Sequence, residues 1–371
     1  MSGIVSASSW ANSWPSVATW TVCAGPPTWR SGRNERSERT EREPALSAAS
    51  GSEKTEQKRG GVPRIAIALG DPRGIGPEVT AQALSNSLDA ELTMVGAEDQ
   101  IGPLSAARKV SVGTWGLGSG DIPSDRNRAI RAGRIAGHAV ETAVQLALRG
   151  EVDAIVTAPA HKHALHLAGF PYPGHTEWLA HLAGDVDVAM MLAAEPDDRD
   201  PSADTLRVVL VTTHVPFRDV PALLTLDRVV RTGRVVQVAL RDWWGIEPAR
   251  LAVCALNPHA GESGLFGDEE ERILRPAASQ LGAAGPLSAD TVFVRALRHE
   301  FDAVLAPYHD VGMTAIKVAA FGRAVNVTLG LPFPRTSPDH GTAFDIAGTG
   351  KADPSSMRAA IELAVRLARR R

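Results

Sequence analysis

The chain has 371 residues, of which 22% are charged, and a formal net charge of −3. This length can bury a substantial core, which excludes small disulfide-stapled scaffolds, and the balanced charge argues against general nucleic-acid binders and polybasic membrane proteins. The two cysteines, Cys23 and Cys254, lie too far apart for a CxxC metal site. Because no apolar run is long enough to span a bilayer, we expect a soluble protein of the cytoplasm, with neither nucleic acid nor membrane as a partner.

Residues 1–61 differ in composition from the rest of the chain. The first 29 residues carry no charged side chain but four of the eight tryptophans, and residues 30–60 are rich in Arg and Glu with little to bury. A secretory signal would place basic residues before its apolar segment, whereas the first charge here is Arg30. We predict a disordered, low-complexity tail, with a targeting or partner-binding role as the alternative, and a catalytic unit over residues 62–371.

From Arg64 onward, short apolar runs alternate with helical patterns. Strands are predicted at residues 64–69, 92–95, 154–156, 186–192, 206–212, 250–256, 301–305 and 325–329. Helices are predicted from near Pro77 and over residues 129–148, 227–241, 269–281 and 355–370, and the proline-rich stretch 331–337 is typical of a loop. This alternation predicts an α/β fold with a mostly parallel sheet, in which ligands bind beyond the carboxyl ends of the strands.

Two stretches that follow predicted strands have the composition of anion sites. Residues 70–78 (GDPRGIGPE) form a glycine-rich turn before a helix, although they match neither the dinucleotide nor the P-loop fingerprint. His175 and Thr176 lie where a helix begins and can present side chains and amides to an anion, and Lys162 adds a positive charge. A plain strand-to-helix connection and helix capping are the alternatives.

Three histidines each follow an apolar strand within a few residues. His214, His259 and His309 stand in the stretches TTH, NPHAGE and YHD, so we expect them to converge on one edge of the sheet. Three imidazoles suit a catalytic divalent cation with an open position for substrate oxygen, and Asp310 is placed to orient His309. The alternative is that these side chains only satisfy backbone groups of their loops.

A set of cations occurs near the C-terminal end of the chain. Lys317, Arg323 and Arg335 flank Asn326 in the sequence. Arg binds phosphate or carboxylate bidentately and Lys contributes a point charge, so this group suits an anionic substrate. Solvated surface charges are the alternative.

The stretches in this order resemble a known family. They include GDPRGIGPE, VTAPAHK, GHTEW, TTHVPFRD, LNPHAGES, APYHDVGMTAIK and RTSPDHGTAFDIAGTG, and they are similar to blocks of the 4-hydroxythreonine-4-phosphate dehydrogenase family of pyridoxal phosphate (vitamin B6) biosynthesis. The resemblance covers residues 62–371. It implies two interleaved α/β/α lobes like those of isocitrate and isopropylmalate dehydrogenases, with the active-site cleft between the lobes. It also implies a homodimer in which both subunits contribute to the active site.

The activity implied by the resemblance is an NAD-dependent, metal-dependent oxidation of 4-phosphooxy-L-threonine, with NADP as a possible cofactor. The product is a 3-oxo acid that decarboxylates to 3-amino-2-oxopropyl phosphate. The implied metal ligands are His214, His259 and His309, for a divalent cation such as Zn, Co, Mn or Mg. The implied substrate-binding residues are His175, Thr176, Lys317, Asn326 and Arg335. Candidates for the proton acceptor are Lys162, a metal-linked water and, as a weaker one, Asp310.

Departures from the family pattern keep alternatives open for the substrate. Val311 stands where many members have Gln, and Arg73 occupies a position that is often small. A related 4-phosphorylated hydroxy acid, D-threonate or D-erythronate 4-phosphate, is therefore the runner-up substrate. A metal-dependent hydrolase or lyase that works without NAD is the alternative from another class of enzyme.

Overall fold

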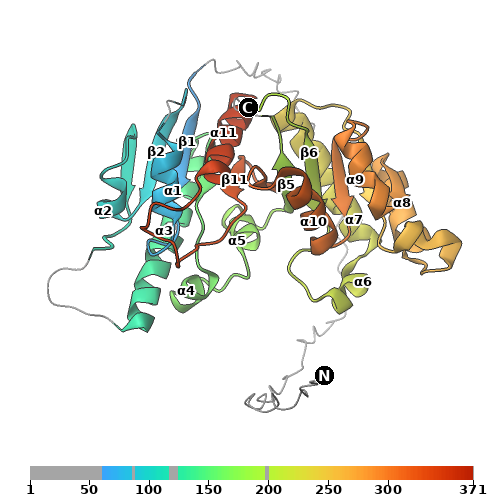
Figure 1. Cartoon of the computed structure of the whole chain (residues 1–371), viewed down its shortest axis with the longest axis horizontal. Helices are drawn as coiled ribbons and strands as arrows, with labels where there is room; N and C mark the ends of the chain where they lie inside the picture. Colours follow the sequence, from blue (N-terminus) through green and yellow to red (C-terminus); the bar gives the residue numbers. More distant parts are fainter. Residues whose placement is uncertain (1–60, 86–87, 117–123, 197–199, 371) are drawn as a thin grey trace, which may run out of the picture. The chain divides into compact units, whose positions relative to one another are not determined.

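The computed structural model describes residues 61–85, 88–116, 124–196 and 200–370. The predicted N-terminal tail therefore lies outside the described residues. The described residues form one unit, built on an 11-stranded sheet with the order β3-β2-β1-β4-β11-β10-β5-β6-β9-β7-β8 (Figure 1). The strands are β1 (Arg64–Ala68), β2 (Glu91–Gly96), β3 (Arg108–Ser111), β4 (Ala154–Thr157), β5 (Ala189–Ala194), β6 (Leu206–Leu210), β7 (Leu251–Cys254), β8 (Ala284–Leu287), β9 (Ala303–Ala306), β10 (Val325–Leu329) and β11 (Arg335–Pro338).

The strand pairings confirm the predicted α/β class with a mostly parallel sheet. Seven of the ten pairings are parallel, and the three antiparallel ones join β11, β10, β5 and β6 in the middle of the sheet. Because β10 runs against its neighbours, its first residues lie at the same edge as the last residues of β11. This edge also holds the ends of β4 and β5 and the starts of β6 and β9, so β6 and β9 end at the opposite edge.

Most connections between strands contain helices. The longer helices are α1 (Gly76–Ala83), α3 (Asp125–Leu148), α5 (His175–Leu182), α7 (Leu226–Ala239), α8 (Arg275–Leu281), α9 (Ala289–Leu297), α10 (His309–Ala320) and α11 (Ser355–Arg370). The shorter ones are α2 (Glu98–Ile101), α4 (Lys162–Leu167) and α6 (Val220–Leu223), with single turns η1 (Phe217–Asp219), η2 (Leu240–Trp244), η3 (Pro258–Gly264) and η4 (Glu270–Leu274). No helix among these described segments is both long and apolar enough to cross a membrane.

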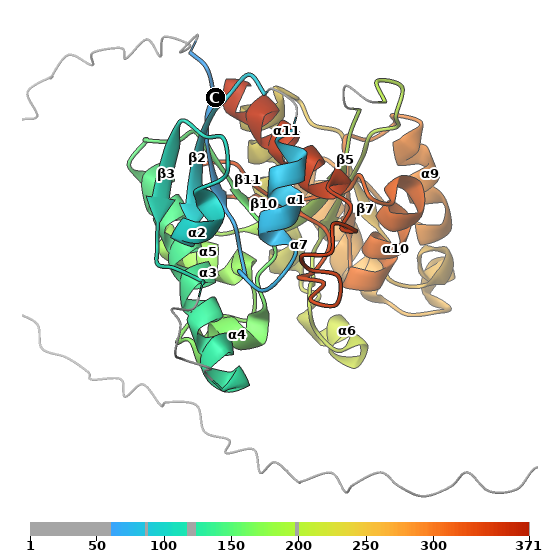
Figure 2. The same ribbon diagram turned by 60° about the vertical axis from the view of Figure 1, so that its left-hand side comes forward.

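Alternation along the strands places apolar side chains on both faces of the sheet. In β1, Ile65 and Ile67 belong to one buried cluster and Ala66 and Ala68 to another, as the two-residue period of a strand requires. The first cluster contains residues of α1, α7, α8 and α11, and Figure 2 shows α1 beside α11 on that face. The opposite face is covered by α3 and α5 near β1 and by α9 and α10 near β6. Both faces are therefore buried, as is usual for parallel sheets.

Helix boundaries follow local signals in the sequence. The side chain of Ser124 accepts a hydrogen bond from the Asn127 N–H and caps the start of α3, and Thr225 caps α7 in the same way through the Arg228 N–H. After α3 the chain turns at Gly150, which has a φ of 69°. These caps place α3 and α7 within a few residues of their predicted limits.

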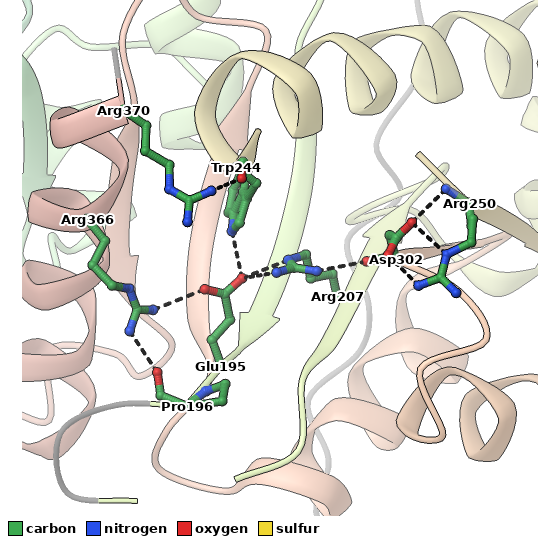
Figure 3. Close-up of polar contacts among 8 residues, drawn as sticks. All are labelled: Glu195, Pro196, Arg207, Trp244, Arg250, Asp302, Arg366 and Arg370. Carbon is green, nitrogen blue, oxygen red and sulfur yellow. Dashed lines mark hydrogen bonds and ion pairs between the residues drawn. The ribbon is translucent and has the colours of Figure 1, made fainter. Parts of the chain in front are cut away.

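A largely buried ion-pair network ties α11 and η2 to the sheet (Figure 3). Glu195, which follows β5, is 12% exposed and accepts hydrogen bonds from Arg207 of β6, Trp244 of η2 and Arg366 of α11, at 2.7, 2.7 and 3.0 Å. Arg207 donates in addition to the carbonyl of Asp302. One carboxylate thus connects three separate segments of the chain.

The structure corrects the prediction of a loop over residues 331–337. β11 begins at Arg335 and pairs with both β4 and β10. Its sequence, RTSP, has no apolar run, yet all four residues are buried, because the flanking strands and α11 enclose them. β3, β8, α9 and α10 also lie outside the predicted elements, as do the short helices α2, α4 and α6.

Candidate active site

A cavity of about 330 Å³ lies over the middle of the sheet, between the segments that follow β4 and β11 at one edge and those that follow β6 and β9 at the other. It is lined by residues from the starts of α4, α5 and α10, from β5, β10 and β11, and from the segment after β11. Six of the eight predicted metal- and substrate-binding residues line it: His175, Thr176, His214, His309, Asn326 and Arg335. Lys162 also lines it, whereas Asp310 does not. Segments far apart in the sequence therefore form one site, and many of them directly follow strands of the sheet.

Arg335 is the positively charged side chain of the cavity that best indicates the type of ligand. Its side chain is 3% exposed, and its Nε and Nη2 donate to Thr157 Oγ1 at 3.1 and 2.6 Å, while Nη1 donates to Thr328 Oγ1 at 3.1 Å. Burial lowers the pKa of Arg335 to about 10, so the guanidinium still carries its charge at neutral pH. Its partners within the described part of the chain are neutral hydroxyl groups. A buried cation without a carboxylate partner is costly until an anion binds beside it.

Three further polar groups of the cavity lack partners among the described residues. His175 Nε2, Asn326 Oδ1 and His340 Nε2 are buried and make no hydrogen bond. Burial, reinforced by the charges of Arg335 and Lys162, lowers the pKa of His175 to about 3, so its ring is neutral at physiological pH. Buried polar groups are normally hydrogen-bonded, so a ligand with several acceptors and donors fits this end of the cavity.

His214 and His309 lie side by side in the lining of the cavity. They follow the parallel neighbours β6 and β9, and their ring centroids are 5.4 Å apart. Asp310 Oδ1 contacts His309 Nδ1 at 2.7 Å, which leaves Nε2 to bind a metal, as in many carboxylate–histidine–metal sites. Burial lowers the pKa of His214, and the charges of Lys162 and His309 lower it further, so the neutral, metal-binding form of His214 is favoured.

His259 does not join this pair within one chain. It follows β7, the neighbour of β9, at the predicted sheet edge, but residues 259–263 form a left-handed turn, in which the φ angles lie between 44° and 80°. The side chain is 66% exposed, contacts Glu262 through Nδ1 at 3.1 Å, and does not line the cavity. Across the described segments, no three His, Cys, Asp or Glu side chains come close enough to hold a metal. The predicted convergence therefore applies to two of the three histidines.

Two of the predicted cations are already paired. Lys317 Nζ donates to Asp339 Oδ2 at 2.7 Å, and Lys317 is not among the residues that line the cavity, although Asp339 is. Arg323 contacts Asp200 at 3.5 Å and lines a separate crevice together with Glu195 and Arg366, so it does not belong to the site.

The glycine-rich loop of residues 70–78 has a structural role. Gly70 has a φ of 73°, and a Cβ atom there would lie 2.2 Å from the Pro159 carbonyl oxygen, so only glycine fits. The carboxylate of Asp71 is fully buried and is occupied by Arg73, whose Nε and Nη2 donate to it at 3.0 and 2.7 Å. The loop thus packs against the segment after β4 and lies outside the cavity lining.

The sequence predictions missed several residues of the site. Thr157 and Thr328, which bind Arg335, were not predicted as part of it, nor were Asp339 and Glu177, which line the cavity. The available signal for Thr157 and Thr328 was a hydroxyl residue near the end of an apolar strand, which is too common to single them out. Asp339 stands in a loop whose position depends on β11.

The sequence model of the family described as "Pyridoxal phosphate biosynthetic protein PdxA" matches residues 77–364. The chain belongs to this family. It is 42% identical over 333 residues to the 4-hydroxythreonine-4-phosphate dehydrogenase of Burkholderia vietnamiensis, which covers 83% of the chain and 97% of that relative. It is also 42% identical over 332 residues to the D-threonate 4-phosphate dehydrogenase of Salmonella typhimurium, covering 82% and 98%.

A solved PdxA-family structure has the same fold. The 4-hydroxythreonine-4-phosphate dehydrogenase of Klebsiella pneumoniae superposes with a TM-score of 0.71 at 38% identity, and covers 82% of this chain and 99% of its own. The names of these PdxA-family relatives are those of oxidoreductases, and a dehydrogenase family implies a nicotinamide cofactor in general. About four fifths of the chain thus accounts for nearly the whole length of its relatives.

Proposed function

We propose that the protein is an NAD-dependent, metal-dependent dehydrogenase of 4-phosphooxy-L-threonine in pyridoxal phosphate biosynthesis. The product is a 3-oxo acid, which loses carbon dioxide to give 3-amino-2-oxopropyl phosphate. Arg335 carries this proposal, because it is a buried cation that faces the cavity and whose partners among the described residues are neutral. A phosphate group supplies the missing negative charge and can accept both arms of the guanidinium.

Different residues of the cavity bind the two ends of the substrate. Arg335 binds the phosphate, with Thr176, Asn326 and the neutral ring of His175 completing its hydrogen bonds. The carbinol then faces the pair His214 and His309, whose rings are 5.4 Å apart. This arrangement fixes the carbon that loses hydride to the nicotinamide and so lowers the entropic cost of reaction.

The hydroxyl proton needs an acceptor within reach of the same carbon. Lys162 lines the cavity at the start of α4, whereas Asp310 is exposed and already contacts His309. We therefore favour Lys162 over Asp310 as the acceptor, with a metal-linked water as the alternative. Loss of carbon dioxide from the 3-oxo acid leaves the bonding electron pair on the substrate, where protonation completes the reaction.

Two of the three proposed metal ligands lie together within one chain, which is fewer than a divalent cation site needs. His214 and His309 supply two adjacent imidazoles, and we propose that His259 of a second copy supplies the third in a homodimer. A cation such as Zn, Co, Mn or Mg would act there as a Lewis acid on the substrate hydroxyl. Exposed apolar side chains support self-association, because Val318 and Phe321 lie at the end of α10 and Leu265 and Phe266 lie beyond the His259 turn.

A subunit-mixing experiment tests this arrangement. His214→Ala and His259→Ala variants should each be inactive, while a mixture that forms hybrid dimers should regain about a quarter of wild-type activity, since one intact site forms in each hybrid. Size-exclusion chromatography and metal analysis of the mixture control for association. A mixture that forms hybrids yet stays inactive would refute a site shared between subunits.

We also propose that residues 62–371 form the catalytic unit, with two interleaved lobes around the cleft. Separate apolar clusters support this, because one joins α3 and α5 to the β1 side and another joins α9 and α10 to the β6 side of the sheet. Residues 1–61 would then be dispensable. A chain that begins at Val62 should keep the catalytic efficiency of the full chain, and loss of activity would contradict this.

The proposed activity is tested by a substrate panel. Purified protein with NAD or NADP and each candidate metal should form reduced nicotinamide with 4-phosphooxy-L-threonine. D-threonate 4-phosphate and D-erythronate 4-phosphate belong in the same panel, because a D-threonate 4-phosphate dehydrogenase is a relative of 42% identity. Absence of nicotinamide reduction with all three acids would refute the proposal and favour the metal-dependent hydrolase or lyase.

A further inference from the structure

We propose that Asp339 and Ser356 are positioning residues that hold the ammonium group of Lys317 for the substrate phosphate. The inference rests on the proposed function and adds to it Lys317, one of the substrate-binding residues that the family resemblance implies. Nothing in the sequence patterns pointed to either residue. Their role follows from how the structure pairs a half-buried lysine with a buried carboxylate at the rim of the cavity.

The carboxylate of Asp339 is fixed on both oxygen atoms. Its side chain is 6% exposed, Oδ2 accepts from Lys317 Nζ at 2.7 Å, and Oδ1 accepts from Ser356 Oγ at 3.0 Å. Ser356 Oγ in turn accepts from the Asp339 N–H at 3.1 Å. Ser356 is buried in the first turn of α11, a 16-residue helix, where the helix dipole favours a carboxylate. Asp339 therefore has one orientation, and Lys317 is directed by it.

The pair joins the two halves of the proposed site. Asp339 directly follows β11, the strand of Arg335, and lines the cavity. Lys317 lies on α10, about 12 Å along the helix from His309 at 1.5 Å per residue. The ion pair thus connects the strand that carries the phosphate-binding guanidinium with the helix that carries a proposed metal ligand. A flexible lysine held in this way loses less entropy when the phosphate arrives.

A double-mutant cycle separates positioning from a purely structural role. Asp339→Asn should weaken the Kd for inorganic phosphate and raise the KM for the phosphorylated substrate, each by about 10- to 100-fold, and change kcat by less than about 5-fold. In the Lys317→Met background the same substitution should change both constants by less than about 3-fold, because the group that Asp339 positions is gone. Asp339→Glu should restore part of the loss, and Ser356→Ala should give a smaller loss of the same kind.

A matched control removes a comparable ion pair away from the cavity. Asp302, which precedes β9 and accepts from Arg250 at 2.9 Å, lies at the opposite end of that strand from His309. Asp302→Asn should lower the Tm without changing the substrate KM or the phosphate Kd. A general loss of folding would affect both variants alike, so the difference between them isolates the effect on substrate.

Three outcomes would overturn the inference. They are an unchanged phosphate Kd in Asp339→Asn, full additivity with Lys317→Met, and an equal effect of the Asp302→Asn control. The phosphate Kd is measured by calorimetry and does not depend on turnover. A wild-type protein that oxidises none of the three acids would therefore refute the proposed function, while the phosphate measurements would still decide the role of Asp339.

Discussion

Replacing Arg335 with methionine should separate the function of this residue from its contribution to stability. Methionine keeps much of the apolar length of the side chain and removes the charge. The guanidinium is buried among Thr157, Thr328 and the cavity, and no carboxylate of the described residues balances it. We expect the variant to fold with little change in stability and to lose phosphate binding.

The magnitude follows from two opposing terms in the free energy of unfolding. Burial lowers the pKa of Arg335 from 12.5 to about 10, which corresponds to a burial cost of about 3 kcal/mol at 1.36 kcal/mol per pKa unit. Against this, the variant loses three hydrogen bonds to threonine hydroxyls, each of about 1 kcal/mol net. The two terms nearly cancel, so the free energy of unfolding should change by less than about 2 kcal/mol.

For the free energy of substrate binding, no second term offsets the loss of the guanidinium. Loss of a buried, charge-assisted contact to phosphate costs about 2–5 kcal/mol, so kcat/KM should fall by roughly 30- to 5,000-fold. The assays are denaturant unfolding, nicotinamide reduction, and the rise in Tm that inorganic phosphate gives the wild type. Arg335→Lys, which keeps the charge without the planar fork, should fall between the two proteins. A loss of more than about 3 kcal/mol in stability with the KM unchanged would show that Arg335 is structural and that phosphate binds elsewhere.

Two further predictions concern stability. Glu195→Gln removes the charge that Arg207 and Arg366 share in the largely buried network, and it should lower the free energy of unfolding by about 3–5 kcal/mol in denaturant unfolding. Glu271→Gln, in an exposed pair, should lower it by less than about 1 kcal/mol. Equal losses would refute the distinction between buried and exposed pairs. The pKa of His175 is about 3 in the fold against the ordinary value of 6.5, so the unfolded chain binds a proton between these pH values and stability falls as the pH drops below 6.5. At pH 5 this loss is about 2 kcal/mol, and His175→Asn should remove it from the difference between unfolding at pH 7 and pH 5; an unchanged difference would contradict the buried, neutral ring.

The parts of the fold that the sequence predicted are those in which local patterns and tertiary packing agree. Short apolar runs predicted β1, β4, β6, β7, β9 and β10 to within a few residues, because strands that are buried on both faces are apolar along most of their length. β11 was not predicted, because its residues form no apolar run. Its four polar or proline residues are buried by β4, β10 and α11, and this tertiary environment leaves no local trace.

In the candidate site, too, some features could be predicted from local sequence and others depend on tertiary structure. The predicted histidines each follow a strand, and because β6, β9 and β7 are parallel neighbours, all three lie at one edge. Which of them meet depends on a backbone feature without a sequence pattern, namely the left-handed turn that begins at His259. The pairing of Lys317 with Asp339 was equally hidden, since it joins residues 22 positions apart through the placement of β11.

The distribution of charge explains how a chain with a net charge of −3 can offer a site for a phosphorylated acid. Many arginines of the described segments are held by carboxylates at the surface, as Arg272 is by Asp268 and Arg275 by Glu271. Such pairs are neutral at a distance and contribute little to binding. Arg335 differs because its partners in the described structure are hydroxyl groups, so its field is not cancelled by them and is little screened by water. The selectivity for an anion therefore arises from one buried charge held by neutral groups, which the net charge of the chain does not reveal.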